Sequence, residues 1–182
     1  MRIISGKYRA KLLKSPKTGE VRPTSDRARE ALFNILHSKI GGNWEKIKFL
    51  DVFAGTGAVG LEALSRGANL VGFIDINTSN LMQNVKLFPV ESNKIKVYKT
   101  DVSKLMPATE HFNVLFLDAP YEKNLSELAL ALLAEKKWVD DEAFVIVETR
   151  NSEDFLASDG FYLEDERVYG PAKFRFFNYR KT

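Results

Sequence analysis

The sequence predicts an α/β fold with a doubly wound, mostly parallel, seven-stranded sheet. Three observations lead to this prediction. From residue 47 onward short apolar runs alternate with helical stretches, a glycine-rich turn follows the first run, and two strand-like runs without an intervening helix come last. Near-continuous apolar strands separated by helices are typical of parallel sheets covered on both faces. With 182 residues, 45% of them hydrophobic, the chain fits a single compact domain.

The chain starts with a basic segment, residues 1–23, which we distinguish as a small arm from the main domain, residues 24–182. Apolar and basic residues mix around Gly6 and predict a short hairpin or an extended arm over residues 2–14. A helix is expected from Thr24 or Ser25 as its N-cap to the Gly41-Gly42 pair. The predicted buried stripe of this helix consists of Ala28, Ala31, Leu32, Ile35 and Leu36.

Five strands are expected after this helix, in the apolar runs at residues 47–53, 70–74, 95–98, 114–117 and 143–147. Helical stretches fit between most of them, around residues 58–66, 77–87 and 124–137. The runs at 161–169 and 173–179 are joined through Gly170-Pro171, so they predict an antiparallel hairpin added to the edge of the sheet.

The charge is divided unevenly along the chain. Residues 1–40 hold ten Lys and Arg against three Asp and Glu, a balance of +7, whereas residues 41–182 hold 17 against 21, a balance of −4. Such a division indicates either an arm that binds a polyanion or an ordinary solvated surface. Most of the positive charge comes from eight residues: Arg2, Lys7, Arg9, Lys11, Lys14, Arg22, Arg27 and Arg29.

The composition excludes several classes of site. Because the chain has no cysteine, it has no disulfide, thiolate zinc site or cysteine nucleophile. The two histidines, His37 and His111, lack metal-ligand spacing, and no metal is expected. Neither a membrane-spanning run nor a signal peptide is apparent in the sequence, so a cytoplasmic protein without membrane contact is expected.

The stretch Gly55-Thr56-Gly57-Ala58-Val59-Gly60 follows the first strand directly and opens the next helix. This G-x-G-x-x-G pattern lets a nucleotide-like ligand approach the backbone closely, and Asp75, 20 residues beyond Gly55, is placed to bind ribose hydroxyls. The pattern alone suits nicotinamide nucleotides and S-adenosylmethionine equally well.

Acidic residues at three successive strand ends favour the cationic cofactor, S-adenosylmethionine. Asp51 can face the positively charged aminoacyl portion but would repel a pyrophosphate. Asp101 is placed to accept a hydrogen bond from an adenine amino group. Capping roles remain as alternatives, a loop cap for Asp51 and a helix N-cap for Asp101.

The fourth strand is followed by Asp118-Ala119-Pro120-Tyr121, which suits a planar amine. The lone pair of an aromatic exocyclic amine is delocalised, but two acceptors, the Asp118 carboxylate and the Ala119 carbonyl, can orient the nitrogen toward a sulfonium methyl. Pro120 restricts the preceding residue, and Tyr121 can stack on a base. A simple Asp-Pro turn is the structural alternative.

At this point the sequence resembles the bacterial methyltransferases of the RsmD type, which have a Rossmann-like class I methyltransferase fold and methylate guanine N2 in 16S ribosomal RNA. The resemblance rests on residues 2–8, 22–36 and 51–68, and the most specific part of them is Arg22-Pro23-Thr24-Ser25-Asp26-Arg27. The sequence departs from the family at one position. The family motif is usually Asp-Pro-Pro-Tyr, and here Ala119 replaces its first proline. The backbone carbonyl survives that change, so activity is expected to persist.

The resemblance implies 16S ribosomal RNA, or the small ribosomal subunit, as partner of a monomeric enzyme. Asp118, Ala119, Pro120 and Tyr121 are the expected residues of the chemical step. The basic residues expected to bind RNA are Lys7, Arg9, Lys11, Arg22 and Arg27. Expected cofactor contacts are Asp51, Ala54, Gly55, Thr56, Gly57, Asp75, Ile76, Asp101 and Val102.

Three other functions remain open. An adenine-N6 methyltransferase acting on DNA or RNA would use the same four-residue motif. A nicotinamide-dependent dehydrogenase would use the same glycine turn, although no acid/base pair for it is evident. A non-catalytic RNA-binding factor with a methyltransferase shell is indicated only by Ala119.

Overall fold

The computed structural model describes residues 1–15, 26–120 and 124–181. The expected N-cap at Thr24 or Ser25 lies outside these residues. The helical elements are α1 (Asp26–Lys39), η1 (Trp44–Lys46), α2 (Ala58–Arg66), α3 (Ser79–Val85), η2 (Pro89–Lys94), η3 (Val102–Lys104) and α4 (Leu125–Glu135). The strands are β1 (Lys48–Val52), β2 (Leu70–Asp75), β3 (Ile95–Lys99), β4 (Phe112–Leu117), β5 (Val139–Arg150), β6 (Phe161–Tyr169) and β7 (Ala172–Tyr179).

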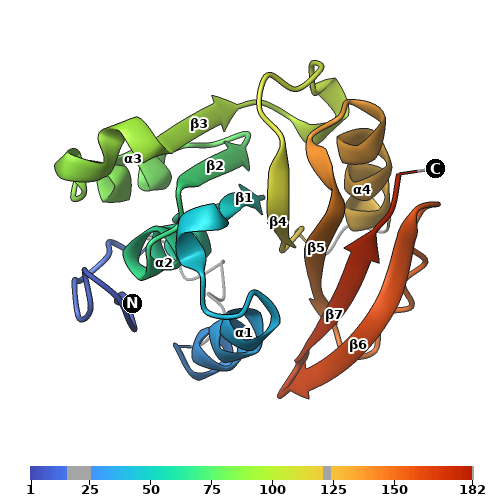
Figure 1. Ribbon diagram of the computed structural model, residues 1–182, viewed down its shortest axis with the longest axis horizontal. Coiled ribbons are helices and arrows are strands. Elements are labelled where there is room, and N and C mark those ends of the chain that lie inside the picture. The colour runs from blue at the N-terminus through green and yellow to red at the C-terminus, as the bar shows by residue number, and fades with distance from the viewer. Residues whose placement is uncertain (16–25, 121–123, 182) are drawn as a thin grey trace.

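The strands form one seven-stranded sheet in the order β3-β2-β1-β4-β5-β7-β6 (Figure 1). The first five pair in parallel, and β7 pairs antiparallel with both β5 and β6. The strand order reverses between β1 and β4, which is the position where open α/β sheets bind ligands. The sheet and its final hairpin confirm the predicted fold class.

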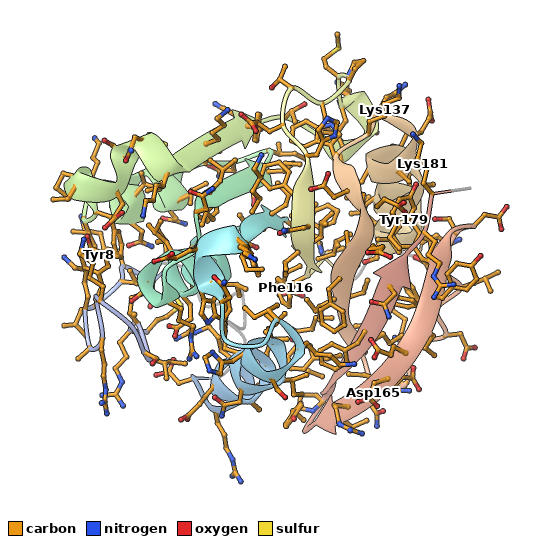
Figure 2. All side chains as sticks on the ribbon, in the orientation of Figure 1. Tyr8, Phe116, Lys137, Asp165, Tyr179 and Lys181 are labelled. Carbon is orange, nitrogen blue, oxygen red and sulfur yellow. The ribbon has the colours of Figure 1, made fainter. Side chains whose placement is uncertain are left out.

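Two apolar cores form because alternate side chains of each strand point to opposite faces. One core joins α1, α2 and α3 to the face that carries Phe49, Phe73 and Phe116, and Phe116 lies between β4 and α1 in Figure 2. The other joins α4 to the face that carries Leu50 and Leu115. Helices therefore cover both faces, as Figure 1 shows.

The buried stripe of α1 differs from the predicted one. Arg29 and Phe33 are buried together with Ala28, Leu32 and Leu36, whereas Ala31 and Ile35 are only half-buried. The prediction was wrong on two members because it treated arginine as a surface residue. With Arg29 included, residues 29, 32, 33 and 36 follow the spacing of one helix face.

The amino-terminal arm folds back on itself and docks on α2 and α3. An isolated antiparallel bridge joins Arg2 to Leu12, which confirms the expected hairpin. The Glu62 carboxylate on α2, fully buried, accepts hydrogen bonds from the backbone N–H groups of Ile4 and Ser5 at 2.7 and 3.0 Å. Asn84 on α3 accepts one from Lys14 N–H at 2.7 Å.

Strand β5 is much longer than the predicted run at 143–147, since it starts at Val139 and ends at Arg150. Residues 140–142 are polar, so the apolar pattern did not include them. Pairing with neighbouring strands extends β5 at both ends. Phe112 of β4 pairs with Val139, and β7 pairs with β5 as far as Arg150. The shift between Phe112 and Val114 in this pairing is a β-bulge or irregularity.

The two outer strands of the sheet, β3 and β6, have different lengths. β3 has five residues, with Lys96 and Lys99 among them. β6 has nine residues, includes the charged run at 164–167, and shifts its register against β7 between Leu163 and Asp165. Glu164 forms an ion pair with Lys39 at the end of α1.

Across the described parts of the chain, no helix is both long enough and apolar enough to cross a membrane.

The buried carboxylate of Glu62 should determine how firmly the arm is held. Glu62→Gln removes the charge that binds two backbone N–H groups and Arg66 Nε, 2.8 Å away. We expect the free energy of unfolding, measured by urea denaturation, to fall by about 1.5–3 kcal/mol. Hydrogen exchange at the Ile4 and Ser5 amides should accelerate.

Glu45→Gln is the matched control, because Glu45 is exposed and its unfolding free energy should change by less than about 0.5 kcal/mol. If the Ile4 and Ser5 amides of the Glu62→Gln variant stay as protected as in the parent protein, the carboxylate does not hold the arm.

Candidate functional site

A cavity of about 1210 Å³ lies at the carboxyl ends of the parallel strands, where the strand order reverses. Residues that follow β1, β2, β3, β4 and β5 all contribute to its lining. The lining side chains include five carboxyl groups and two guanidinium groups: Asp51, Asp75, Asp101, Asp118, Glu148, Arg29 and Arg150. The cavity is large enough for a nucleoside-sized ligand together with a second group.

The glycine turn after β1 forms the floor of this cavity. Gly55 has φ +55°, and a Cβ there would meet only the Phe53 carbonyl oxygen, 4.0 Å away, so a ligand can approach the backbone closely. Gly57 has φ +75°, and a Cβ there would lie 2.4 Å from Leu81 Cδ1. Glycine is therefore favoured by the positive φ at Gly55, where the space beside the backbone is open, and required by packing at Gly57.

Asp51 is buried at the end of β1, and its Oδ2 accepts a hydrogen bond from Gly60 N–H at 2.8 Å. This is the loop-capping contact of the alternative interpretation, but Asp51 also lines the cavity. Burial raises the pKa of Asp51 to about 8, although the Gly60 N–H opposes this shift and the charge of Asp75 adds to it. A cationic group bound beside Asp51 would favour its ionised form.

Asp75 and Asp101 occupy the next two strand ends. Asp75 accepts hydrogen bonds from Gly55 N–H at 2.7 Å and Asn77 N–H at 2.8 Å, so it ties the end of β2 to the glycine turn. Asp101 accepts bonds from Ser103 N–H and Oγ at the start of η3. The N-cap alternative for Asp101 is confirmed, and those bonds lower its pKa. Both residues line the cavity.

Asp118 is half-buried directly beyond β4. Loss of solvent around it, followed by the charges of Glu148 and Asp51, raises its pKa well above the usual range. Leu117 pairs with Val147 in the parallel register of β4 and β5, so Asp118 and Glu148 are the next residues on neighbouring strands. Ala119 and Pro120 also line the cavity, whereas Tyr121 lies outside the described residues.

The structure therefore brings most of the predicted cofactor and base-binding residues into one cavity. All of the expected cofactor contacts except Gly57 line it, and Gly57 instead packs against Leu81. Asp118, Ala119 and Pro120 lie in the same lining.

The basic arm residues have more internal contacts than predicted. Lys7 Nζ lies 2.6 Å from the largely buried carboxylate of Glu91, which also accepts a hydrogen bond from the Tyr8 hydroxyl. Lys11 Nζ donates to the Leu87 carbonyl at 3.0 Å. Arg9 and Arg27 are exposed, and Arg22 lies outside the described residues.

Sequence reasoning missed several residues that line the cavity, among them Arg29, Phe53 and Glu148. Arg29 had been grouped with the exposed cations of the arm, but its side chain is 1% exposed. The available signal for the burial of Arg29 was its spacing from Leu32 and Leu36, which places it on the apolar face of α1. Glu148 follows an apolar run near the carboxyl end of a strand, where the four predicted acids also lie. We found no sequence signal for Phe53, which adopts φ +63°.

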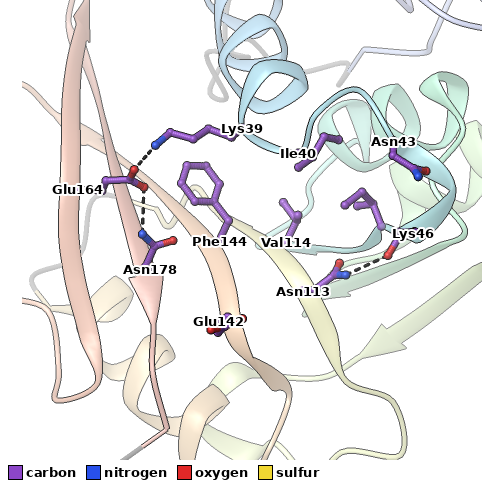
Figure 3. Close-up of a pocket in the computed structure, with 11 residues that line it drawn as sticks. Lys39, Ile40, Asn43, Lys46, Asn113, Val114, Glu142, Phe144, Glu164 and Asn178 are labelled. Atoms are coloured by element: carbon purple, nitrogen blue, oxygen red, sulfur yellow. Dashed lines mark hydrogen bonds and ion pairs between the residues drawn. The ribbon is translucent and has the colours of Figure 1, made fainter.

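A second cavity, of about 430 Å³, lies near the opposite ends of the strands and is shown in Figure 3. Its polar lining groups pair with one another: Glu164 accepts from Lys39 and Asn178, and Asn113 donates to the Lys46 carbonyl. These contacts join α1, η1, β4, β6 and β7, and we assign them a structural role.

Among residues 1–15, 26–120 and 124–181, no group of three or more His, Cys, Asp or Glu side chains is arranged to hold a metal ion.

Comparison with known proteins shows the family to which this chain belongs. A family model described as Conserved hypothetical protein 95 matches residues 1–178. Ribosomal RNA small subunit methyltransferase D of Haemophilus influenzae is 33% identical over 183 residues, which cover 97% of this chain and 93% of that protein. The enzyme of the same name from Escherichia coli strain K12 is also 33% identical, over 97% of this chain and 89% of its own length.

The solved structure of yhhF from Escherichia coli superposes with a TM-score of 0.85 at 31% identity and covers 100% of this chain and 99% of its own. Sequence and architecture agree over nearly the full length of both chains, as the resemblance of residues 2–8 and 51–68 had indicated. The chain belongs to the RsmD-type family, the Conserved hypothetical protein 95 family of the small-subunit ribosomal RNA methyltransferases D.

Proposed function

We propose that this protein transfers a methyl group from S-adenosylmethionine to the exocyclic N2 amino group of a guanine in 16S ribosomal RNA. The observation that carries the proposal is the single cavity that contains both the glycine turn with its acids and the Asp118-Ala119-Pro120 segment. A methyl transfer requires the cofactor and the amine side by side. Relatives named as ribosomal RNA small subunit methyltransferases support the RNA substrate.

The lining residues fit the proposed cofactor. Gly55 leaves space for a close approach to the backbone, Asp75 can accept hydrogen bonds from ribose hydroxyls, and Asp101 can accept one from an adenine amino group. The cofactor would supply an electrophilic methyl group on a positively charged sulfur. Asp51, buried with a pKa of about 8, gains a favourable interaction from a nearby cation, which a pyrophosphate would not provide.

The proposed chemical role of Asp118 is to orient the target amine. Its carboxylate and the Ala119 carbonyl would each accept one N–H of the amine, so the nitrogen lone pair points away from both acceptors. A raised pKa of Asp118 falls again when an N–H donor binds, because the donor favours the ionised carboxylate. Pro120 restricts the backbone of Ala119, which limits the freedom of that carbonyl.

We also propose that the arm, residues 1–23, binds RNA together with Arg27 in the first turn of α1 of the domain 24–182. The proposal rests on the +7 balance of residues 1–40 and on the exposure of Arg9 and Arg27. The contacts of Lys7 and Lys11 hold the arm on the domain, and Lys7 remains 62% exposed, so it can still contact a phosphate.

The direct test supplies radiolabelled S-adenosylmethionine with purified small ribosomal subunits and with naked 16S RNA, then identifies the labelled nucleoside after digestion. Label in N2-methylguanosine supports the proposal, and label in N6-methyladenosine replaces it with the adenine alternative. Absence of label on both substrates, with cofactor bound, supports an RNA-binding factor.

Replacing Asp75 tests the cofactor site. Asp75→Ala removes the acceptor proposed for the ribose hydroxyls, and S-adenosylmethionine affinity, measured by calorimetric titration, should weaken by about 1.5–3 kcal/mol. Asp159→Ala is the control, because Asp159 is exposed and outside the cavity lining. Unchanged affinity in a folded Asp75→Ala protein would remove Asp75 from the site.

Replacing Asp118 separates chemistry from cofactor binding. Asp118→Ala should abolish methyl transfer to the RNA substrate, because the amine loses the acceptor that orients it, while cofactor affinity stays within about threefold. Radiolabel incorporation and calorimetric titration measure the two effects independently. Substantial residual turnover would show that another group orients the amine.

The arm prediction concerns salt dependence. Replacing both Arg9 and Arg27 by glutamine should flatten the plot of log K for RNA binding against log salt by about 0.7–0.9 per lost phosphate contact. Lys46→Gln with Lys137→Gln is the matched control at the amino ends of β1 and β5, since both lysines are exposed. Equal slopes for the two double variants would indicate that the arm is an ordinary solvated surface.

A further inference from the structure

Arg29 is the least exposed charged side chain of α1 and one wall of the cavity. Its Nη2 donates to the Arg2 carbonyl at 2.5 Å and to Asp26 Oδ1 at 2.9 Å. Its Nε is buried and has no hydrogen-bond partner among the described residues. A buried N–H donor without a partner is rare and costly in a folded protein.

The surroundings of Arg29 compensate its charge incompletely. Burial lowers its pKa, and the charges of Asp26 and Glu62 oppose that effect. Asp26 is 47% exposed, which weakens its attraction, and Glu62 already binds Arg66 and the arm. A ligand in the cavity that brings an anionic group to the guanidinium would compensate its charge.

The proposed cofactor carries such a group. S-adenosylmethionine has a sulfonium and an ammonium, which the acidic lining suits, and a carboxylate, which it repels. The glycine turn offers few free donors, because the N–H groups of Gly55, Gly57 and Gly60 already donate to Asp75, the Ala54 carbonyl and Asp51. The carboxylate therefore needs a guanidinium from the lining.

We propose that Arg29, which lines the cavity, binds the carboxylate of the amino-acid portion of S-adenosylmethionine through its guanidinium. This inference rests on the proposed function, since it takes that cofactor as the ligand. The two bonds from Nη2 fix the plane of the guanidinium, so the group is held in place before the ligand arrives. Arginine presents donors in a rigid fork that matches a carboxylate, which lysine lacks.

The test compares two ligands that differ in this carboxylate. S-adenosylmethionine and decarboxylated S-adenosylmethionine are titrated calorimetrically into the full-length protein without RNA, so no turnover is needed. We expect the parent protein to prefer the carboxylated ligand by about 10- to 150-fold. Arg29→Met should reduce this preference to about threefold or less and leave affinity for the decarboxylated ligand within about threefold.

Arg150→Met is the matched control, because Arg150 is the other guanidinium of the lining and is exposed. It should retain the full preference. If Arg29→Met does not melt cooperatively, Arg29→Lys replaces it; a preference reduced by at least about threefold supports the assignment, because lysine lacks the planar fork.

Three results would overturn the inference. The Arg29→Met variant could keep the full preference for the carboxylated ligand, or it could lose affinity for both ligands equally. In the third result, the Arg150→Met variant loses the preference and Arg29→Met does not. Failure of the parent protein to bind either ligand would overturn the cofactor proposal itself, and the Arg29 inference with it. The two failures are distinguishable because the second appears before any residue is changed.

Discussion

The parallel alignment of β1 to β5 is the constraint on which the candidate site depends. Parallel strands place all their carboxyl ends along one edge of the sheet, and in this chain an acidic residue occurs at or beside each of five such ends. Burial, followed by the charges of neighbouring carboxyl groups, raises the pKa values of Asp51 and Asp118. Such an arrangement suits a ligand that brings positive charge and N–H donors.

The sequence was sufficient to predict the sheet, its final hairpin and four of the five acids, because strand ends and the glycine turn are local patterns. It was insufficient where long-range contacts determine the bounds of a strand or the burial of a side chain. Val139 extends β5 because it pairs with Phe112, and Arg29 is buried because the Arg2 carbonyl meets it from the arm. Neither partner can be identified from a local apolar pattern, since 26 or more residues separate the members of each pair.

The arm and the cavity are connected through a small number of buried polar groups. Asn84 donates to the carbonyls of Lys14 and Thr56, so one amide joins the arm to the glycine turn. Met1 contacts Thr56 through its sulfur at 3.8 Å and lines the cavity. The segment that we propose to bind RNA is therefore in contact with the turn that we propose to hold the cofactor, and movement of one would alter the other.

The outer strands of the sheet have a consequence for how separate copies of the protein behave. An edge strand presents unpaired N–H and C=O groups that can pair with an edge of another molecule and start aggregation. β6 exposes Tyr162, Leu163 and Val168, which would favour such pairing. Its shifted register and the charged run at 164–167 oppose it, and lysines occupy the shorter edge at β3. These features oppose edge-to-edge pairing between neighbouring molecules in a concentrated solution.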